Sequence, residues 1–366
     1  AEVQRDRADD ARADAERQRD AANAARADAE VQRDRADDAA ADAGAQRDRA
    51  LAQADNADAA LEFLRDLLLR AAPDVALGQP PALDAVIEDG AAELLGSRSP
   101  RAPDMQARLH VLMGQFLESF GRLDMPRQIL ERGLAYEPAD PDTPAWQVLR
   151  AEGLVTLGTT LARQSRFADG ELTLRAALDV LPAFDEARDL VSRARTWLAH
   201  CLANTGRLDE AEALLVETWQ AWEAIAEHDQ RGWRATVLND LADVAGSFRL
   251  RWSDALQPQE RSVELMRQRV DPPHPDLVQP LANLGKYRLN VGDLEGAESA
   301  LLESYLMADA LWTHDTDREA FALLGLARVW SVLGETERAL AGQLAAEALY
   351  AQLGGPEHLN AQVARD

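Results

Sequence analysis

The sequence is poor in cysteine, in lysine and in aromatic residues. It has one cysteine, Cys201, and one lysine, Lys286, and aromatic side chains make up 5% of its 366 residues. A single cysteine excludes an internal disulfide framework and a zinc cluster built on cysteines. No apolar run approaches the roughly 20 residues needed to cross a bilayer, so we expect no membrane span within this sequence.

Basic residues are also scarce relative to acidic ones, 39 against 64, which gives a net charge of −25. This charge repels a phosphate backbone, so we expect no nucleic-acid partner. Almost all the basic residues are arginine and alanine is abundant, a bias that favours a bacterial, GC-rich genome. The sequence shows no secretory signal and does not begin with Met, and we expect it to be part of a longer protein.

Residues 1–60 contain no proline and a single glycine. The peptide Ala1–Ala11 recurs letter for letter at Ala29–Ala39, and alanine occupies every seventh position from Ala1 to Ala57. Alanine, arginine and glutamine favour helix, and whole-heptad periods are typical of coiled coils. We predict a long charged heptad helix over 1–71. One interpretation of this helix is a stalk that self-associates through residues 1–60. A seam of alanine and glutamine buries little area, so a solitary spacer helix or a marginally stable arm stays open as the alternative.

Proline and glycine interrupt the chain after residue 71. A short helix is then predicted from about Leu83 to Leu95, ended by Gly96. We assign residues 72–103 to a capping helix and linker.

Residues 104–366 are predicted to form a helical array, because a pattern with a period of about 42 residues runs through most of them. Each repeat has a small residue after an apolar one, and these small residues are spaced by 44, 41, 43, 43 and 42 residues. A glycine or serine follows seven residues later, except in the fourth repeat, which is irregular over Ala245–Asp254. Two such helices cannot enclose a core alone, so we predict six hairpins stacked into an all-α solenoid with one concave face. The small residues are Gly114, Gly158, Ala199, Ala242, Gly285 and Ala327.

The order of these residues resembles the tetratricopeptide repeat. In that motif a small residue is followed by Gly-x-Leu and a second small residue, as at Gly206-Arg-Leu with Ala211. The long period, and the segment Asp271–Asp276 before Leu281–Gly285, resemble the kinesin-light-chain variety. The resemblance covers about residues 104–354 and implies that the first helix of each hairpin lines the concave face.

A narrower resemblance concerns the segments Ala60–Leu68, Ala72–Asp74 and Leu83–Ala91. They look like the region after the membrane helix in bacterial serine/threonine kinases that carry tetratricopeptide repeats. This resemblance implies a kinase and a membrane helix upstream, both absent from this sequence. It also implies that the array is a sensor or scaffold, extracytoplasmic if kinase-attached and otherwise cytoplasmic, linked to the membrane only through that absent segment.

No catalytic or metal-binding motif stands out. Gly153–Thr160 has the glycine spacing of a phosphate loop, but Thr159 replaces the required lysine. The six histidines lack His-x-x-x-His spacing, and the neighbours His200 and Cys201 point in different directions on a helix. We expect no enzymatic activity, no metal and no cofactor. Most tryptophans should fill the core, although a few are candidates to line a peptide groove.

The candidate binding site follows from the resemblance, in which groove positions lie one, four and five residues after the small residue and three before it. Asparagines at these positions can pair with a peptide backbone, and the lone lysine and two arginines select carboxylates. We therefore predict a protein or peptide partner that bears a carboxylate. The predicted groove residues are Arg163, His200, Asn204, Asn239, Lys286, Asn290 and Arg328, and the same positions include Thr159, Thr196 and Asp243.

These patterns favour a non-catalytic binding scaffold or sensor of a bacterial membrane kinase. A structural spacer or oligomerisation element without a peptide ligand stays open as the alternative. Ordinary solvated polar residues would account for the same groove positions.

Overall fold

The structure is a computed structural model that describes residues 83–96, 103–119, 124–138, 141, 143–181, 187–224, 231–311 and 317–354. The helix predicted over 1–71, with its self-association, lies outside these residues. The helical array belongs to one compact unit, Ile87–Asp366.

The described residues form thirteen α-helices and one π-helix (η2), and they contain no strand, which confirms the all-α prediction. None of these helices is both long and apolar enough to cross a bilayer. In chain order the elements are α2 (Leu83–Gly96), α3 (Pro103–Ser119), α4 (Asp124–Leu134), α5 (Pro144–Arg163), α6 (Phe167–Val180), α7 (Arg188–Asn204), α8 (Leu208–Glu223), α9 (Arg231–Asp243), η2 (Val244–Phe248), α10 (Trp252–Arg267), α11 (Pro275–Val291), α12 (Leu294–Leu311), α13 (Asp317–Leu333) and α14 (Thr336–Gly354).

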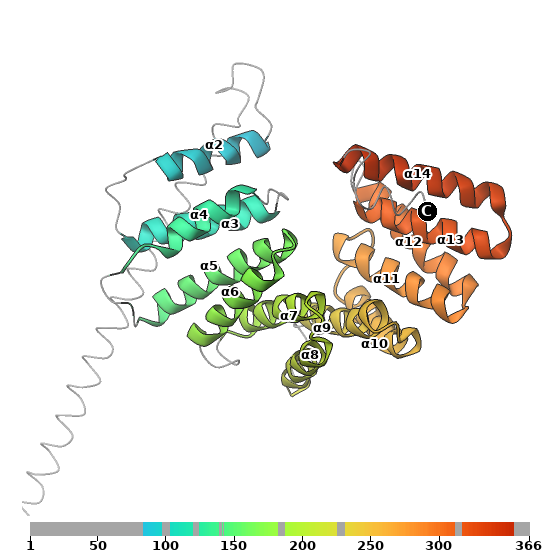
Figure 1. The fold of residues 1–366 in the computed structure, drawn as a ribbon, viewed down its shortest axis with the longest axis horizontal. Helices are drawn as coiled ribbons and strands as arrows, with labels where there is room; N and C mark the ends of the chain where they lie inside the picture. The colour runs from blue at the N-terminus through green and yellow to red at the C-terminus, as the bar shows by residue number, and fades with distance from the viewer. Residues whose placement is uncertain are drawn as a thin grey trace, which may run out of the picture. The chain divides into compact units, whose positions relative to one another are not determined.

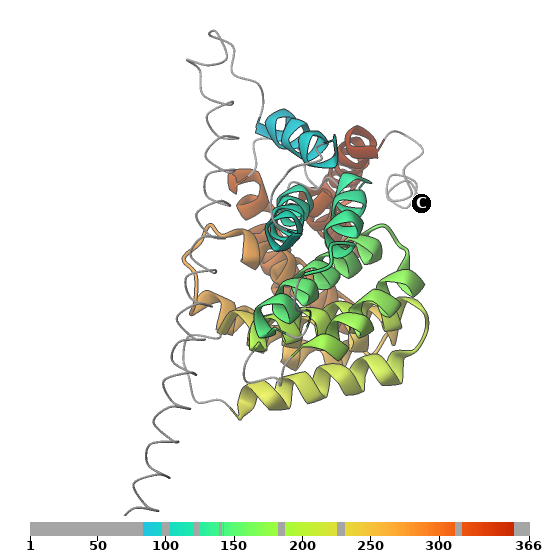
Figure 2. The ribbon, with the colours of Figure 1, turned by 90° about the vertical axis from the view of Figure 1, so that its left-hand side faces the viewer.

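The helices from α3 to α14 pair into six successive hairpins in the described part of the chain (Figure 1). The second helix of each hairpin packs against the first helix of the next, as α4 does on α5 and α6 on α7 (Figure 2). First helices also contact one another, for example α3 with α5 and α5 with α7, whereas no two second helices pack to this extent among the described residues. The first helices therefore form the inner layer of a tetratricopeptide-like α-solenoid, as predicted.

Close approach within a hairpin depends on the small residue of the first helix. A Cβ atom added at Gly158 would lie 2.6 Å from Cγ of Leu174, and one at Gly285 would lie 2.4 Å from Cγ of Leu301. Both leucines are fully buried in apolar clusters that continue into the next hairpin. Any larger side chain at these glycines would push the two helices apart.

Most of the first helices end at a residue with left-handed backbone conformation, which suits glycine. Gly206, Gly292 and Gly334 have φ angles of 83°, 88° and 81°, and Ser165 takes the same place with φ 60°. Each of these lies seven residues after the small residue of its repeat, as the sequence pattern predicts.

The fourth repeat differs because its first helix ends in the π-helix η2. Its left-handed residue is Leu250, with φ 56°, and it lies eight residues after Ala242 rather than seven. A π-helix accommodates one additional residue within a helix, so η2 absorbs the insertion. The irregularity predicted at Ala245–Asp254 is thus a local insertion that leaves the hairpin intact.

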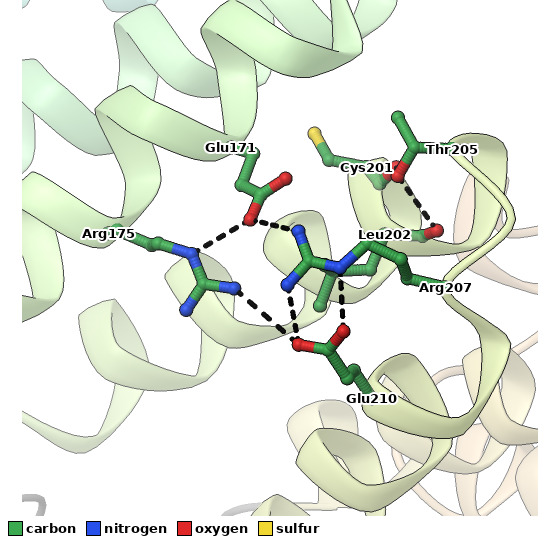
Figure 3. Close-up of polar contacts among 7 residues, drawn as sticks. All are labelled: Glu171, Arg175, Cys201, Leu202, Thr205, Arg207 and Glu210. Atoms are coloured by element: carbon green, nitrogen blue, oxygen red, sulfur yellow. Dashed lines mark hydrogen bonds and ion pairs between the residues drawn. The ribbon is translucent and has the colours of Figure 1, made fainter.

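Ion pairs connect successive hairpins. Arg207, at the turn of the third hairpin, pairs with Glu171 of the second hairpin and with Glu210 of its own (Figure 3). Its Nη1 lies 2.6 Å from Glu171 Oε1, and its Nη2 lies 2.5 Å from Glu210 Oε2. Burial opposes ionisation of Glu171, but hydrogen bonds from Arg175 and Arg207 hold its pKa below the ordinary value. Other neighbouring hairpins are joined by the pairs Arg163–Glu118, Arg249–Asp209, Arg288–Glu260 and Arg338–Glu298.

Candidate functional site

Two adjoining hollows lie along α7 and α9 in the inner layer. The smaller, about 340 Å3, lies between α7 and α9, and the larger, about 750 Å3, extends to α10 and α11. Trp197, Trp233 and Thr236 line both hollows, which together we call the inner groove. The smaller hollow is also lined by Arg193, Thr196, His200 and Asp240, and the larger by residues that include Asn239, Met266, Arg269, Asp276 and Gln279.

The apolar walls of the inner groove are Trp197 and Trp233, both half-buried. Trp222, by contrast, is fully buried, and its indole N–H donates to Ser192 Oγ at 2.8 Å. His200 packs edge-on against Trp197, with ring centroids 5.5 Å apart. Burial lowers the pKa of His200, and the nearby Asp243 opposes this.

A carboxylate, Asp240, lines the smaller hollow together with these two tryptophans. Burial is the main cause that raises the pKa of Asp240 to about 7, and the nearby Asp243 adds to the rise. The amide of Asn239 opposes it by donating from Nδ2 to Asp240 Oδ1 at 3.3 Å. Arg193 of the same hollow donates to Glu118 Oε2 at 2.8 Å, so a carboxylate on another helix already balances its charge.

Amide side chains connect α9, α10 and α11 at one side of the larger hollow. Gln259 Nε2 donates to Asn239 Oδ1 at 3.1 Å and to the carbonyl of Pro280 at 2.8 Å. Asn283 Nδ2 donates to the same Asn239 oxygen at 3.2 Å, and Gln279 Nε2 donates to Asn283 Oδ1 at 3.0 Å. The network fixes the Asn239 side chain, and Asn239 and Gln279 both reach the groove.

Lys286 belongs to a polar cluster built around the π-helix. Its Nζ donates to Ser247 Oγ of η2 at 2.7 Å and lies 5.7 Å from the ring centroid of Tyr287. The hydroxyl of Ser247 donates to Asp243, and that of Tyr287 donates to Asp243 Oδ1 at 3.2 Å. Burial lowers the pKa of Lys286, Asp243 opposes this, and Arg328 adds to it. The π-helix therefore brings Lys286 and Asp243, two predicted positions, into one cluster.

The other predicted residues are spread along the inner layer. Asn204 and Asn290 are exposed, and each donates to the carbonyl four residues earlier, at 2.9 Å and 2.7 Å. Arg163 is exposed and donates to the carbonyl of Glu118 at 3.1 Å. Arg328 is exposed on α13. Of the predicted set, His200 and Asn239 line the inner groove.

Two positions expected to be exposed are buried. Thr159 is 1% exposed and Thr196 is 6% exposed, although Thr196 still touches the smaller hollow. Thr159 donates to the carbonyl of Val155 at 2.8 Å and Thr196 to that of Arg193 at 3.1 Å. The expectation is wrong here because α5 and α7 pack against other first helices, which cover these positions.

Trp197 and Trp233 are among the tryptophans of which a few were expected to line a groove, whereas sequence reasoning missed Asp240, Thr236 and Gln279. Asp240 follows Asn239 directly, at a helix position that the repeat pattern assigns to no particular face. A usable signal was the polar cluster Asn239-Asp240 in an otherwise apolar stretch, three and two residues before the small Ala242.

The stretch that resembles a phosphate loop lies within α5. Both of its glycines pack against side chains, Gly153 against Leu134 and Val111 and Gly158 against Leu174, so no loop is available to hold a phosphate. The described residues contain no group of three or more histidine, cysteine or carboxylate side chains that could hold a metal ion.

No protein-family model matches the chain, and no curated protein matches it in sequence. Several solved structures are similar in fold. A Rap protein in complex with competence and sporulation factor has a TM-score of 0.55 and 12% identity, and the match covers 81% of this chain and 76% of that one. BtubC (BKLC) from P. vanneervenii has a TM-score of 0.50 and 20% identity, covering 66% of this chain and 92% of that one.

A third similar structure is a signal transduction ATPase with numerous domains from Pyrococcus horikoshii, which carries a tetratricopeptide repeat sensor. Its TM-score is 0.52 at 16% identity, and the match covers 77% of this chain and 42% of that one. At these identities the likeness concerns the fold. It agrees with the six hairpins and the inner layer of first helices: the chain folds as a tetratricopeptide-like α-solenoid.

Proposed function

We propose that this protein is a non-catalytic scaffold or sensor that binds a protein or peptide segment in the inner groove. The observation that carries the proposal is the groove itself. Half-buried Trp197 and Trp233 form its apolar walls, and the amides of Asn239 and Gln279 reach it from a fixed network. Apolar walls with a few oriented polar groups are the usual composition of a binding site.

An extended segment is the ligand that these groups suit best. Asparagine and glutamine amides both donate and accept, so they pair with the alternating N–H and C=O groups of a peptide backbone. The similar Rap protein is in complex with competence and sporulation factor, which supports a ligand-binding role for this protein. A ligand carboxylate would pair with Arg328 or Lys286, as the sequence predicts, although neither residue lines the two hollows.

Attachment to a bacterial membrane serine/threonine kinase is the cellular setting that we propose. It is supported by the resemblance of Ala60–Leu68 and Leu83–Ala91 to the segment that follows the membrane helix in such kinases. The array would then be the extracytoplasmic sensor of the kinase. Sequencing the upstream region of the gene tests this, since a kinase and a membrane helix must be encoded there.

Selection from a displayed library of random linear peptides tests the groove. Peptides selected on the intact protein should lose at least about tenfold in affinity when Asn239→Ala removes the anchoring amide, since about 1.4 kcal/mol corresponds to a factor of ten. Gln220→Ala, an exposed amide on the second helix α8, is the matched control and should bind unchanged. If the selected peptides bind the wild type, Asn239→Ala and Gln220→Ala with equal affinity, the inner groove is not their binding site.

A structural spacer that self-associates through residues 1–60 is the second candidate, favoured by the heptad repeat of that segment. Sedimentation equilibrium separates the two. A dimer that becomes a monomer when residues 1–60 are removed, together with a library that yields no groove-dependent peptide, supports the spacer.

A further inference from the structure

The smaller hollow of the inner groove combines two indole rings with one carboxylate. Its volume of about 340 Å3 is at the lower end of the roughly 300–1,000 Å3 of ligand pockets, which suits a single side chain rather than a whole cofactor. Trp197 of α7 and Trp233 of α9 supply the aromatic surfaces, and Asp240 of α9 supplies the charge.

The charges around this hollow leave Asp240 without an ionic partner among the described residues. Arg193 also lines the hollow, but Glu118 of α3 holds its guanidinium at 2.8 Å. The pKa of His200 on α7 is lowered, chiefly by burial. Lys286 lies beside Asp243, which it reaches through Ser247, rather than beside Asp240. The side-chain hydrogen bond to Asp240 is the 3.3 Å contact from Asn239, an uncharged donor.

We propose that the smaller hollow binds a cationic group of the ligand, a guanidinium or an ammonium, between the faces of Trp197 and Trp233 and against the carboxylate of Asp240. This inference rests on the proposed function and specifies the chemistry of its ligand. Aromatic faces attract cations through their quadrupole, and a charge-assisted hydrogen bond to a buried carboxylate is stronger than one between neutral groups. A cation also offsets the cost of burying the charge of Asp240.

The prediction that the ligand bears a carboxylate concerns a different place. Neither Lys286 nor Arg328 lines the smaller hollow, whereas Trp197 and Asp240 do. One extended segment satisfies both predictions if it carries a cationic residue for the smaller hollow and an acidic residue for Lys286 and Arg328.

Titration of the intact protein with Nα-acetyl-argininamide, followed by the indole N–H signals in a nitrogen–proton correlation spectrum, tests the proposal. The neutral isostere Nα-acetyl-citrullinamide should bind at least about tenfold more weakly, because it retains the shape but loses the charge. Asp240→Asn should lower the affinity for the arginine probe by a similar factor. The exposed Asp179→Asn on α6 should leave it unchanged.

A second probe distinguishes a side chain of a peptide from a free small amine. Acetyl-Ala-Ala-Arg-Ala-Ala-amide should bind more tightly than Nα-acetyl-argininamide, and only the gain from its flanking residues should be lost in Gln279→Ala, because Gln279 lines the larger hollow and not the smaller one. Equal affinity of the two probes indicates a small cationic solute as the occupant, and the proposal that the cation belongs to a peptide is then wrong.

The inference and the proposed function fail in different ways. Equal binding of the arginine and citrulline probes, an unchanged affinity in Asp240→Asn, or no binding of the arginine probe overturns the cation site. If library peptides still depend on Asn239 in that case, the proposed function survives without it. Because the two probes are compared on the wild-type protein, a folding defect of a variant cannot produce or hide the difference between them.

Discussion

Replacing Asp240 by asparagine is predicted to stabilise the protein at alkaline pH and to leave its stability nearly unchanged in acid. The pKa of Asp240 rises from 3.8 to about 7 on folding, mainly through burial. The folded state therefore holds the proton more tightly than the unfolded state, and stability is lost as the pH rises from about 4 to about 7. The whole difference corresponds to about 4 kcal/mol. Because the side chain keeps some exposure to the hollow, we expect about 2–4 kcal/mol above about pH 8.

Urea unfolding at several pH values measures this effect. The quantity to compare is the free energy of unfolding of Asp240→Asn minus that of the wild type. It should be near zero at about pH 4, grow through neutral pH and level off above about pH 8. Asp179→Asn, an exposed carboxyl on α6, should show no such trend. A variant that is less stable than the wild type at about pH 8 would refute the reasoning, since the carboxylate would then be stabilised by partners rather than strained by burial.

Three further predictions concern the array. Gly246→Ala should lower the free energy of unfolding in urea by about 1–3 kcal/mol, because the new Cβ would lie 2.7 Å from the ring of the buried Tyr287. Gly334 is exposed and left-handed, a conformation that asparagine tolerates, so Gly334→Asn should lower it less. Arg207→Ala should lower the urea midpoint of unfolding in low salt, and should lower it less in about 1 M salt, where ion pairs are screened. Arg150→Ala, at an exposed position, should leave the midpoint unchanged at both salt concentrations. Equal losses for Arg207→Ala at both salt concentrations would contradict the ionic account. Cys201 is fully buried, and burial raises the pKa of its thiol to about 11. At about pH 8 it should therefore have about 100-fold less thiolate than an ordinary thiol. Fast labelling of the folded protein by iodoacetamide would contradict its burial.

The sequence contains enough information to predict the hairpins, because their packing depends on residue size at a fixed period. Gly158 and Gly285 permit contacts that no larger residue allows, and their spacing gives the repeat. The π-helix η2 could not be placed in the same way. Its insertion moves the left-handed turn to Leu250, a residue with no sequence preference for that conformation, so only the absence of glycine marked the region as irregular.

The candidate site was predicted less completely than the fold. Asn239 follows from the repeat register, because its position relative to Ala242 decides the face of the helix. Thr159 follows from the same rule, yet it is buried, since exposure depends on how closely neighbouring first helices approach. Asp240 was missed, and Trp233 was not singled out from the other tryptophans, because a hollow arises from the packing of two helices, whereas the repeat pattern describes one helix at a time.

The ion pairs between hairpins also bear on the two tryptophan walls. Trp197 stands on the third hairpin and Trp233 on the fourth, and the pair Arg249–Asp209 ties these two hairpins together at their turns. The tie is electrostatic and solvent-accessible, so its stiffness falls as salt rises. An exposed ion pair contributes little to stability, however, and both tryptophans pack against one apolar cluster that includes Leu215 and Val237. That cluster spans the two hairpins, so the separation of the two indoles should depend little on ionic strength.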